Sequence, residues 1–228
     1  MGQMVTPPPG ARFVVVNPPG GSDMSTSKFV MRTFKSREDL YDVYFVDRLS
    51  RKARNDMIPL TIVNGGPDAW YLVTYDVKTE GGVRMPVNYT RLRGALMYSL
   101  CAPVGRSAFL CPDPSAADII RDKVTHYSVV PVEPATPEAA ERVREAFQDL
   151  VNFMAGQVER TTKYVATARN RGGAARKADA VIAKVEAALS GPAAERVERA
   201  FGAGFLDPIR KALTELKEVR RGEYYGQA

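Results

Sequence analysis

The clearest pattern in the chain is a pair of β-type segments, Ile58–Val63 and Ala69–Val77, on either side of Asn64-Gly65-Gly66-Pro67-Asp68. Asn-Gly supplies the positive φ angles of tight hairpin connections, so the pattern predicts that the two strands pair directly. In the second strand two sets of residues alternate, and both are largely apolar: Trp70, Leu72 and Thr74, and Tyr71, Val73 and Tyr75. A strand with two apolar faces is predicted to be central and covered on both sides.

Segments around this pair predict further strands and short helices. Strands are expected at Phe13–Val16, Lys28–Phe34, Val83–Tyr89, Ser107–Cys111 and Tyr127–Val132. Helices are expected at Leu40–Arg54 after a capping pattern at Ser36, at Thr90–Leu100, and at Ser115–Lys123 with Ser115 as N-cap. Pro86 confines the Val83–Tyr89 strand to an edge or a bulge, because proline cannot donate to a sheet ladder. The alternation of strands and helices predicts a small α+β or α/β sheet.

The composition changes at residues 131–137, where three of seven residues are proline. Beyond this point the chain is rich in Ala, Glu, Arg, Lys and Leu, and it predicts helices only. Thr136 as N-cap and Pro137 as first helical residue begin a helix that runs to about Asn170. Further helices are expected at Ala174–Leu189, from Pro192 onward, and at Pro208–Arg221.

Apolar residues in the first of these helices recur about every 3.5 residues, as in a coiled-coil seam. The members of this seam are Val143, Ala146/Phe147, Leu150, Phe153/Met154 and Tyr164. Gln157, Arg160 and Thr161 interrupt it. The helical region is therefore predicted to form helical hairpins or a coiled-coil-like arrangement.

These elements predict the α+β fold class, with a small mixed-sheet domain followed by an all-helical C-terminal region. Residues 1–27 are interpreted as a flexible leader rich in Pro and Gly with one short strand, residues 28–133 as the α+β domain, and residues 134–228 as the helical domain. A short repeat occurs in the helical part. Ala139–Phe147 and Ala193–Phe201 are identical at seven of nine positions, and each follows a proline. The repeat indicates either a duplicated unit or two helix starts of similar composition.

The composition is that of an ordinary globular protein, but the charge is concentrated in one segment. The chain has 228 residues, is 45% hydrophobic and 25% charged, and carries a formal net charge of +6. Residues 160–184 contain seven basic residues and one acid, Asp179, so this segment alone accounts for the whole excess. Its centre, Thr167–Lys177, contains Gly172-Gly173 and is interpreted as a basic turn between two helices.

Arg and Lys on a turn between helices can bind phosphates, and a tyrosine beside them can stack on a base. The candidate nucleic-acid-binding residues are Arg160, Lys163, Tyr164, Arg169, Arg171, Arg176, Lys177 and Lys184. Other interpretations are a solvated face, salt bridges to Glu138, Glu141 and Glu145 of a neighbouring subunit, or an anionic membrane surface. Two further basic clusters would extend a phosphate-binding track if the fold placed them nearby: Arg48, Arg51, Lys52 and Arg54, and Arg84, Arg91 and Arg93.

Most catalytic and metal chemistry lacks the necessary residues. His126 is the single histidine, no nucleophile turn or phosphate-binding loop occurs, and two cysteines cannot form a zinc cluster. His126 is interpreted as a structural residue at a helix end. A metal-dependent nuclease remains a remote alternative through Asp68, Asp76 and Lys78, but the two carboxylates would stand about 26 Å apart along one strand.

Cys101 and Cys111 are interpreted as free, buried, reduced thiols, which indicates the cytoplasm or a particle assembled there. No run of apolar residues is long enough to span a bilayer, and the N-terminus lacks the apolar region of a secretory signal.

The first functional hypothesis is a non-enzymatic accessory protein that binds nucleic acid without sequence preference and needs no cofactor. The alternative is a structural or assembly protein, for example a viral or particle component, in which the C-terminal helices form a homo-oligomer and the leader lies across a neighbour.

Overall fold

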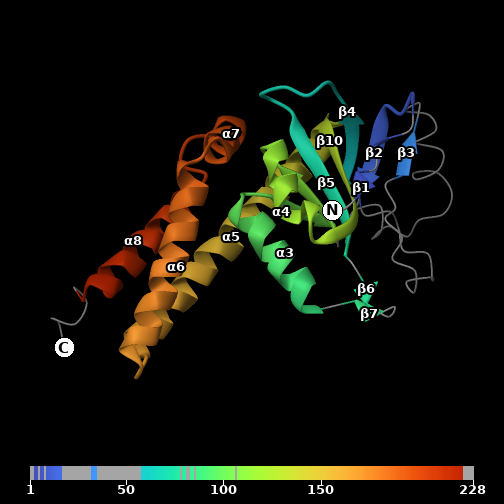
Figure 1. Ribbon diagram of the computed structural model, residues 1–228. Coiled ribbons are helices and arrows are strands. Elements are labelled where there is room, and N and C mark those ends of the chain that lie inside the picture. Colours follow the sequence, from blue (N-terminus) through green and yellow to red (C-terminus); the bar gives the residue numbers. More distant parts are fainter. Residues whose placement is uncertain are drawn as a thin grey trace, which may run out of the picture.

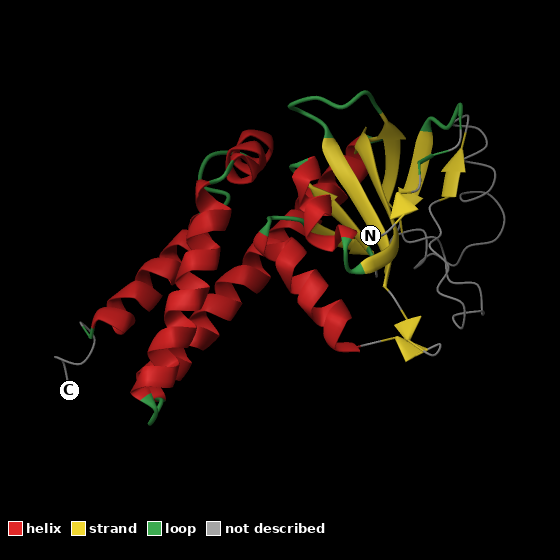
Figure 2. Ribbon diagram, in the orientation of Figure 1, coloured by secondary structure: helices red, strands yellow, loops and turns green. Residues whose placement is uncertain are grey.

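The computed structural model of the chain describes residues 3–4, 6–7, 9–16, 32–34, 58–77, 79–80, 83–84, 86–105 and 107–222. The fold is α+β, as predicted: a sheet built from the N-terminal part is followed by a group of helices (Figure 2). The expected helix Leu40–Arg54 lies outside the described residues. The division into domains at residue 133/134 stays a prediction.

One sheet contains most of the described strands. These are β1 Gln3–Met4, β2 Phe13–Val16, β3 Arg32–Phe34, β4 Ile58–Ile62, β5 Trp70–Val77, β8 Ala102–Gly105, β9 Ala108–Cys111 and β10 Val124–Pro134. Their order is β3-β2-β4-β10-β5-β9-β8, with β1 paired to β10 in parallel. A separate small ladder joins β6 Thr79–Glu80 to β7 Val83–Arg84. The strands expected at Phe13–Val16, Ser107–Cys111 and Tyr127–Val132 are confirmed, whereas β1 and β8 were not predicted.

The longest strand, β10, separates the two strands that the sequence pairs as a hairpin. Both β4 and β5 run antiparallel to β10, on its two opposite edges, so the predicted direct pairing of β4 with β5 is wrong. Ile62 and Trp70 both lie opposite Val132, and the intervening residues cross β10 from one edge to the other. The local Asn-Gly signal fails here because β10, which is distant in sequence, pairs along nearly the whole of β5 and occupies the edge that β4 would have used.

Strand β5 is central, as its two apolar faces predicted. It lies between β10 and β9, and Leu72, Val73 and Tyr75 are buried from both faces. His126 lies within β10 opposite Asp76, so its placement at a helix end is wrong.

The helix α3 spans Pro86–Tyr98 and begins four residues before the expected start. Pro86 therefore occupies a first helical turn, where a missing N–H costs nothing, and the predicted strand is reduced to β7. The helix expected after Pro112 is present as a 3₁₀ turn, η2 Pro114–Ala117, followed by α4 Asp118–Arg121. Its N-cap is Asp113, whose carboxylate accepts from the Ser115 N–H at 2.7 Å, and not Ser115 itself.

The four C-terminal helices occur where the sequence predicts them: α5 Pro137–Thr167, α6 Arg171–Ser190, α7 Pro192–Phe201 and α8 Asp207–Arg221. The Thr136 hydroxyl accepts from the Ala139 N–H at 3.1 Å, which confirms the N-cap of α5. Figure 1 shows that α5, α6 and α8 extend away from the sheet, with the α5–α6 turn at the end farthest from it.

The apolar seam predicted for α5 packs against other parts of the same chain. Val143, Phe147, Leu150 and Met154 are buried in one hydrophobic cluster that includes residues of both the sheet and the helices. Phe153 and Tyr164, which the sequence places in the same seam, are 43% and 44% exposed.

Trp70 is the point where the sheet meets the helices. Its ring lies 4.6 Å from that of Phe147 in α5 and 5.5 Å from that of Phe201 in α7. These two phenylalanines end the two copies of the short repeat, so both copies converge on one tryptophan. Arg196 lies over the same ring at 4.4 Å and donates to the Asp68 carbonyl, and burial lowers the pKa of its guanidinium.

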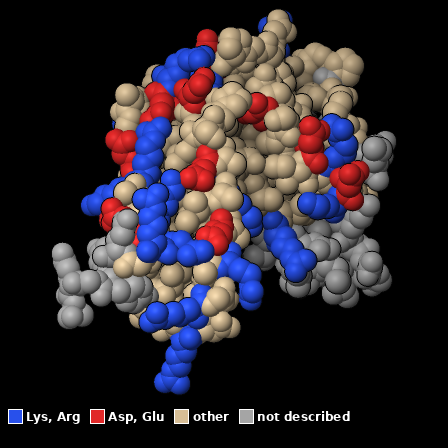
Figure 3. All heavy atoms as spheres, turned by 60° about the vertical axis from the view of Figure 1, so that its left-hand side comes forward, with Lys and Arg blue, Asp and Glu red and all other residues tan. Residues whose placement is uncertain are grey.

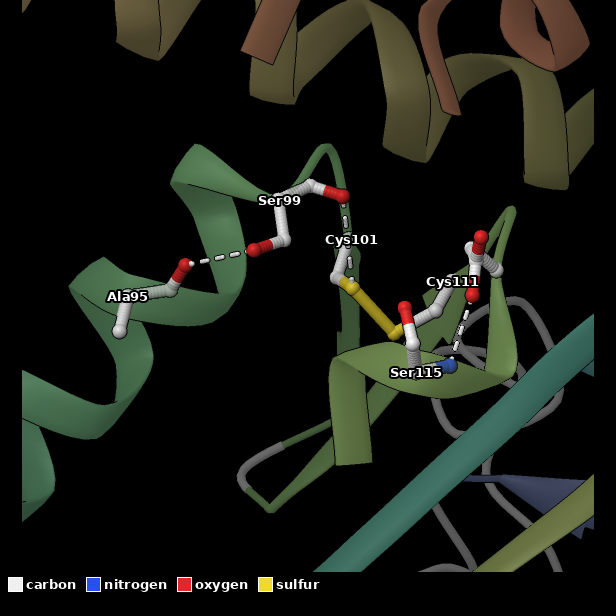
Figure 4. The surroundings of a disulfide bond; sticks show 6 residues. Ala95, Ser99, Cys101, Cys111 and Ser115 are labelled. Atoms are coloured by element: carbon white, nitrogen blue, oxygen red, sulfur yellow. Dashed lines mark hydrogen bonds between the residues drawn. A yellow bond between two sulfur atoms is a disulfide. The ribbon is translucent and has the colours of Figure 1, made fainter. Parts of the chain in front are cut away.

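A disulfide joins Cys101 to Cys111, so the expectation of free thiols is wrong (Figure 4). The antiparallel register that sets Ala102 opposite Leu110 brings the two cysteines together, with Cα atoms 4.2 Å apart. The sequence did not reveal this pairing because β8, which contains Pro103 and Gly105, was not predicted as a strand. The two cysteines therefore no longer indicate a reducing compartment.

We expect Trp70→Ala to lower the free energy of unfolding by about 3–5 kcal/mol, because it removes the ring on which α5 and α7 pack. Urea unfolding followed by circular dichroism measures this. Phe153→Ala is the control, since its side chain is exposed and its loss should cost no more than about 0.5 kcal/mol. Equal effects of the two substitutions would contradict the central position of Trp70.

Reduction of Cys101–Cys111 should lower the free energy of unfolding by about 2–3 kcal/mol, because the bond closes a short loop in the unfolded chain. Denaturation with and without dithiothreitol measures the difference, and a Cys101→Ala/Cys111→Ala variant should be insensitive to the reductant. Two titratable thiols in the unfolded, unreduced protein would show that the bond is absent.

Candidate nucleic-acid interface

The basic segment forms the outer part of the α5–α6 hairpin. Arg160, Lys163 and Tyr164 lie in the last turns of α5 and Arg169 lies in the turn, whereas Arg171, Arg176, Lys177 and Lys184 belong to α6. All eight side chains are exposed. What this surface binds stays a prediction.

The turn between the helices is shorter than the sequence suggested. It consists of residues 168–170, and Gly172 and Gly173 lie in the first turn of α6 rather than in a glycine hinge. Asn170 caps this helix, its side-chain oxygen accepting from the Gly173 N–H at 2.9 Å. A Cβ on Gly173 would lie 3.0 Å from the Asn170 amide nitrogen, so glycine permits the close approach of the cap.

Tyr164 and Lys177 connect the two helices at the outer end of the hairpin. The Lys177 ammonium lies 4.5 Å from the centre of the Tyr164 ring, a distance at which a cation is attracted by the ring face. This contact fixes which sides of α5 and α6 adjoin each other. It also leaves the tyrosine ring 44% exposed beside a lysine.

Helical spacing assigns two more basic residues to this side of the hairpin. Arg160 precedes Tyr164 by four residues, and Lys184 follows Lys177 by seven, so each lies on the same face of its helix as its partner. The Lys184 ammonium lies 5.7 Å from the Tyr98 ring of α3. Four of the eight predicted residues, Arg160, Tyr164, Lys177 and Lys184, therefore share one surface, which we call the hairpin face.

The other four predicted residues surround the hairpin face rather than belong to it. Arg176 and Arg171 lie about 100–120° around the α6 axis from Lys177, and Lys163 lies about 100° around α5 from Tyr164. Arg169 lies in the turn between the helices. The structure thus places these cations around the outer end of the hairpin, and not in a single row.

The acids of α6 are paired with bases of α8. Asp179 accepts from Arg220 at 2.9 and 3.1 Å, and these hydrogen bonds lower the pKa of its carboxyl. Glu186 lies 2.7 Å from the Lys217 ammonium. The one acid of the basic segment is therefore already neutralised by a cation from another helix.

The distribution of charge is visible on the molecular surface. In Figure 3 the hairpin turn lies at the bottom of the molecule. Lys and Arg side chains project at this end, whereas acidic and basic side chains are mixed above it. Sequence reasoning missed Arg220 and Tyr98, because no local pattern connects either residue with the segment 160–184.

The secondary basic clusters are not joined to the hairpin face by any described contact. Arg48, Arg51, Lys52 and Arg54 lie outside the described residues. Arg91 is exposed, and the Arg93 guanidinium lies 6.0 Å from the Phe109 ring centre, so it is held against the sheet. The continuous track stays a prediction.

The nuclease alternative gains no support from the described part of the chain. Within it, no three His, Cys, Asp or Glu side chains are close enough to hold a metal ion. Asp68 precedes β5, where its carboxylate lies 3.8 Å from Arg199, whereas Asp76 lies near the opposite end of that strand.

In comparisons with known proteins, no protein-family model matches this chain, and searches of curated proteins and of solved structures find no match.

Proposed function

We propose that this chain is a non-enzymatic accessory protein that binds nucleic acid, without sequence preference, through the outer end of the α5–α6 hairpin. The observation that carries the proposal is the hairpin face itself. Lys177 lies against the exposed Tyr164 ring, Arg160 and Lys184 lie on the same faces of their helices as these two residues, and the one acid of the segment is paired with Arg220.

Phosphates account for most of the affinity of non-specific nucleic-acid binding, because each one bound by Lys or Arg releases condensed counterions. Exposed cations on a rigid helical pair meet this requirement, since their charges are solvated and not committed to a buried partner. Lys177 and Lys184 are separated by about 10 Å along α6, which is enough for more than one phosphate to be contacted.

The assembly alternative would need a surface other than the predicted seam. Val143, Phe147, Leu150 and Met154 pack inside the chain, so this row does not offer a coiled-coil partner an apolar stripe. A homo-oligomer, and a location in the cytoplasm or in a particle assembled there, stay predictions. Among the described residues, no helix combines the length and apolar character of a membrane span.

The charge on the hairpin can be tested by a matched pair of triple variants. We expect Arg160→Ala/Arg176→Ala/Lys177→Ala to weaken binding of a fluorescent oligonucleotide and to reduce the slope of log K against log salt by about 2. Alanine at exposed helical positions preserves the helices. Fluorescence anisotropy across a salt series measures both quantities.

The control, Lys123→Ala/Arg144→Ala/Lys211→Ala, removes the same charge from exposed positions elsewhere. It should leave the salt slope nearly unchanged. If both variants bind alike, or if the wild-type protein does not bind the oligonucleotide at all, the proposal fails.

Removal of the Asp179–Arg220 ion pair should increase the affinity for nucleic acid. Asp179→Ala removes the single acid of the segment 160–184 and releases the Arg220 guanidinium, so it should tighten binding at low salt and add about one phosphate contact to the salt slope. Glu141→Ala makes the same change in net charge at the opposite end of α5 and should have little effect. Weaker binding by the Asp179 variant would contradict the assignment of this surface.

A further inference from the structure

Few large apolar side chains of the described residues are exposed to solvent. They are Met4, Phe153 and Tyr164, and the last two belong to the same helix, α5. Most other large apolar side chains of α5 are buried in the core, so packing in the core does not account for these two exposed rings.

The two rings lie on one stripe of α5 with an arginine between them. Phe153, Arg160 and Tyr164 are separated by seven and four residues, which places them within about 20° of a common line along the helix. The rings are about 16 Å apart along the axis, and Arg160 lies nearer to Tyr164. Because Lys177 contacts Tyr164, this stripe lies on the side of α5 that adjoins α6.

The two rings and the basic side chains of the stripe favour a partner that has both negative charge and accessible aromatic faces. Basic side chains border it on α5 and α6, and the acids of α6, Asp179 and Glu186, are engaged by α8. A second copy of this chain, placed symmetrically on the stripe, would bring Arg160 and Lys177 of both copies together, and like charges repel. A duplex has the negative charge but stacks its bases inside, where neither ring can reach their faces.

We infer that the hairpin face and Phe153 bind single-stranded nucleic acid, with unpaired bases stacked on Tyr164 and Phe153 and phosphates bound by Arg160, Lys177 and Lys184. The inference rests on the proposed function and narrows it to one form of the ligand. Base–aromatic stacking tolerates any sequence, because every base has a π face, so it agrees with binding that lacks sequence preference.

The first experiment compares an oligo(dT) strand of about 20 nucleotides with the oligo(dA)·oligo(dT) duplex of the same length. Wild-type protein should bind the single strand more tightly than the duplex. Tyr164→Leu and Phe153→Leu, which remove a ring but keep an apolar side chain, should each weaken single-strand binding on the order of tenfold and leave the duplex affinity unchanged. Tyr164→Phe keeps the ring and should retain single-strand binding.

The second experiment places a reporter in the stripe. In Tyr164→Trp the new indole should be quenched when oligo(dT) binds, since stacking on a base quenches its fluorescence. The native Trp70 is 5% exposed and should not respond, so wild-type protein is the control for this signal. Circular dichroism of each variant verifies that the helices are intact.

The outcomes distinguish failure of the proposed function from failure of the single-strand inference. If neither the strand nor the duplex binds, the proposed function itself is wrong. If both bind equally, the charge-removing triple variant weakens both, and neither the Leu variants nor the fluorescence of Tyr164→Trp shows an effect, nucleic-acid binding stands and the single-strand inference is overturned. Selective loss of single-strand binding in the Leu variants, together with quenching, supports the inference.

Discussion

The ring of Trp70 packs against Phe147 and Phe201 and joins the sheet to the helices. Trp70 begins the central strand β5, Phe147 belongs to α5 and Phe201 to α7, so one ring joins three segments that are far apart in sequence. Arg196 covers the same ring and is anchored to the Asp68 carbonyl just before β5. The N-terminal half of α5 is thereby fixed on the sheet, because Phe147, the buried aromatic side chain of this helix, lies there.

Because α5 is one long helix, packing its N-terminal half on the sheet also determines where its C-terminal half lies. Since α5 has 31 residues and is held near Phe147, its C-terminal half extends away from the sheet, alongside α6 and α8 (Figure 1). The burial pattern of α5 reflects this: its buried residues run from Ala139 to Thr161, whereas Phe153, Arg160, Lys163 and Tyr164 are exposed. The exposed basic end is thus a consequence of the same interaction that closes the core.

The candidate site combines a local property with a tertiary one. Its charge is local, since the basic residues of 160–184 are contiguous, and a helical segment with few apolar residues exposes them wherever it packs. Its neutralised acid and its position beside Tyr98 are tertiary, because Arg220 and α3 come from other parts of the chain. Phe153 illustrates the difference: the sequence pattern assigned it to an apolar seam, whereas the packing of Met154 beside it into the core left it exposed.

Elements whose signals are short-range could be predicted from the amino-acid sequence. The four C-terminal helices, the Thr136 cap, the Pro137 start and the central character of β5 follow from residues within a few positions of each other, and all are present in the structure. Long-range packing set the pairing of β4 and β5 with β10, the Cys101–Cys111 bond and the convergence of the repeated Phe147 and Phe201 on Trp70. These depend on which distant segments bury the most surface and complete the most backbone hydrogen bonds together, and no local pattern contains that information.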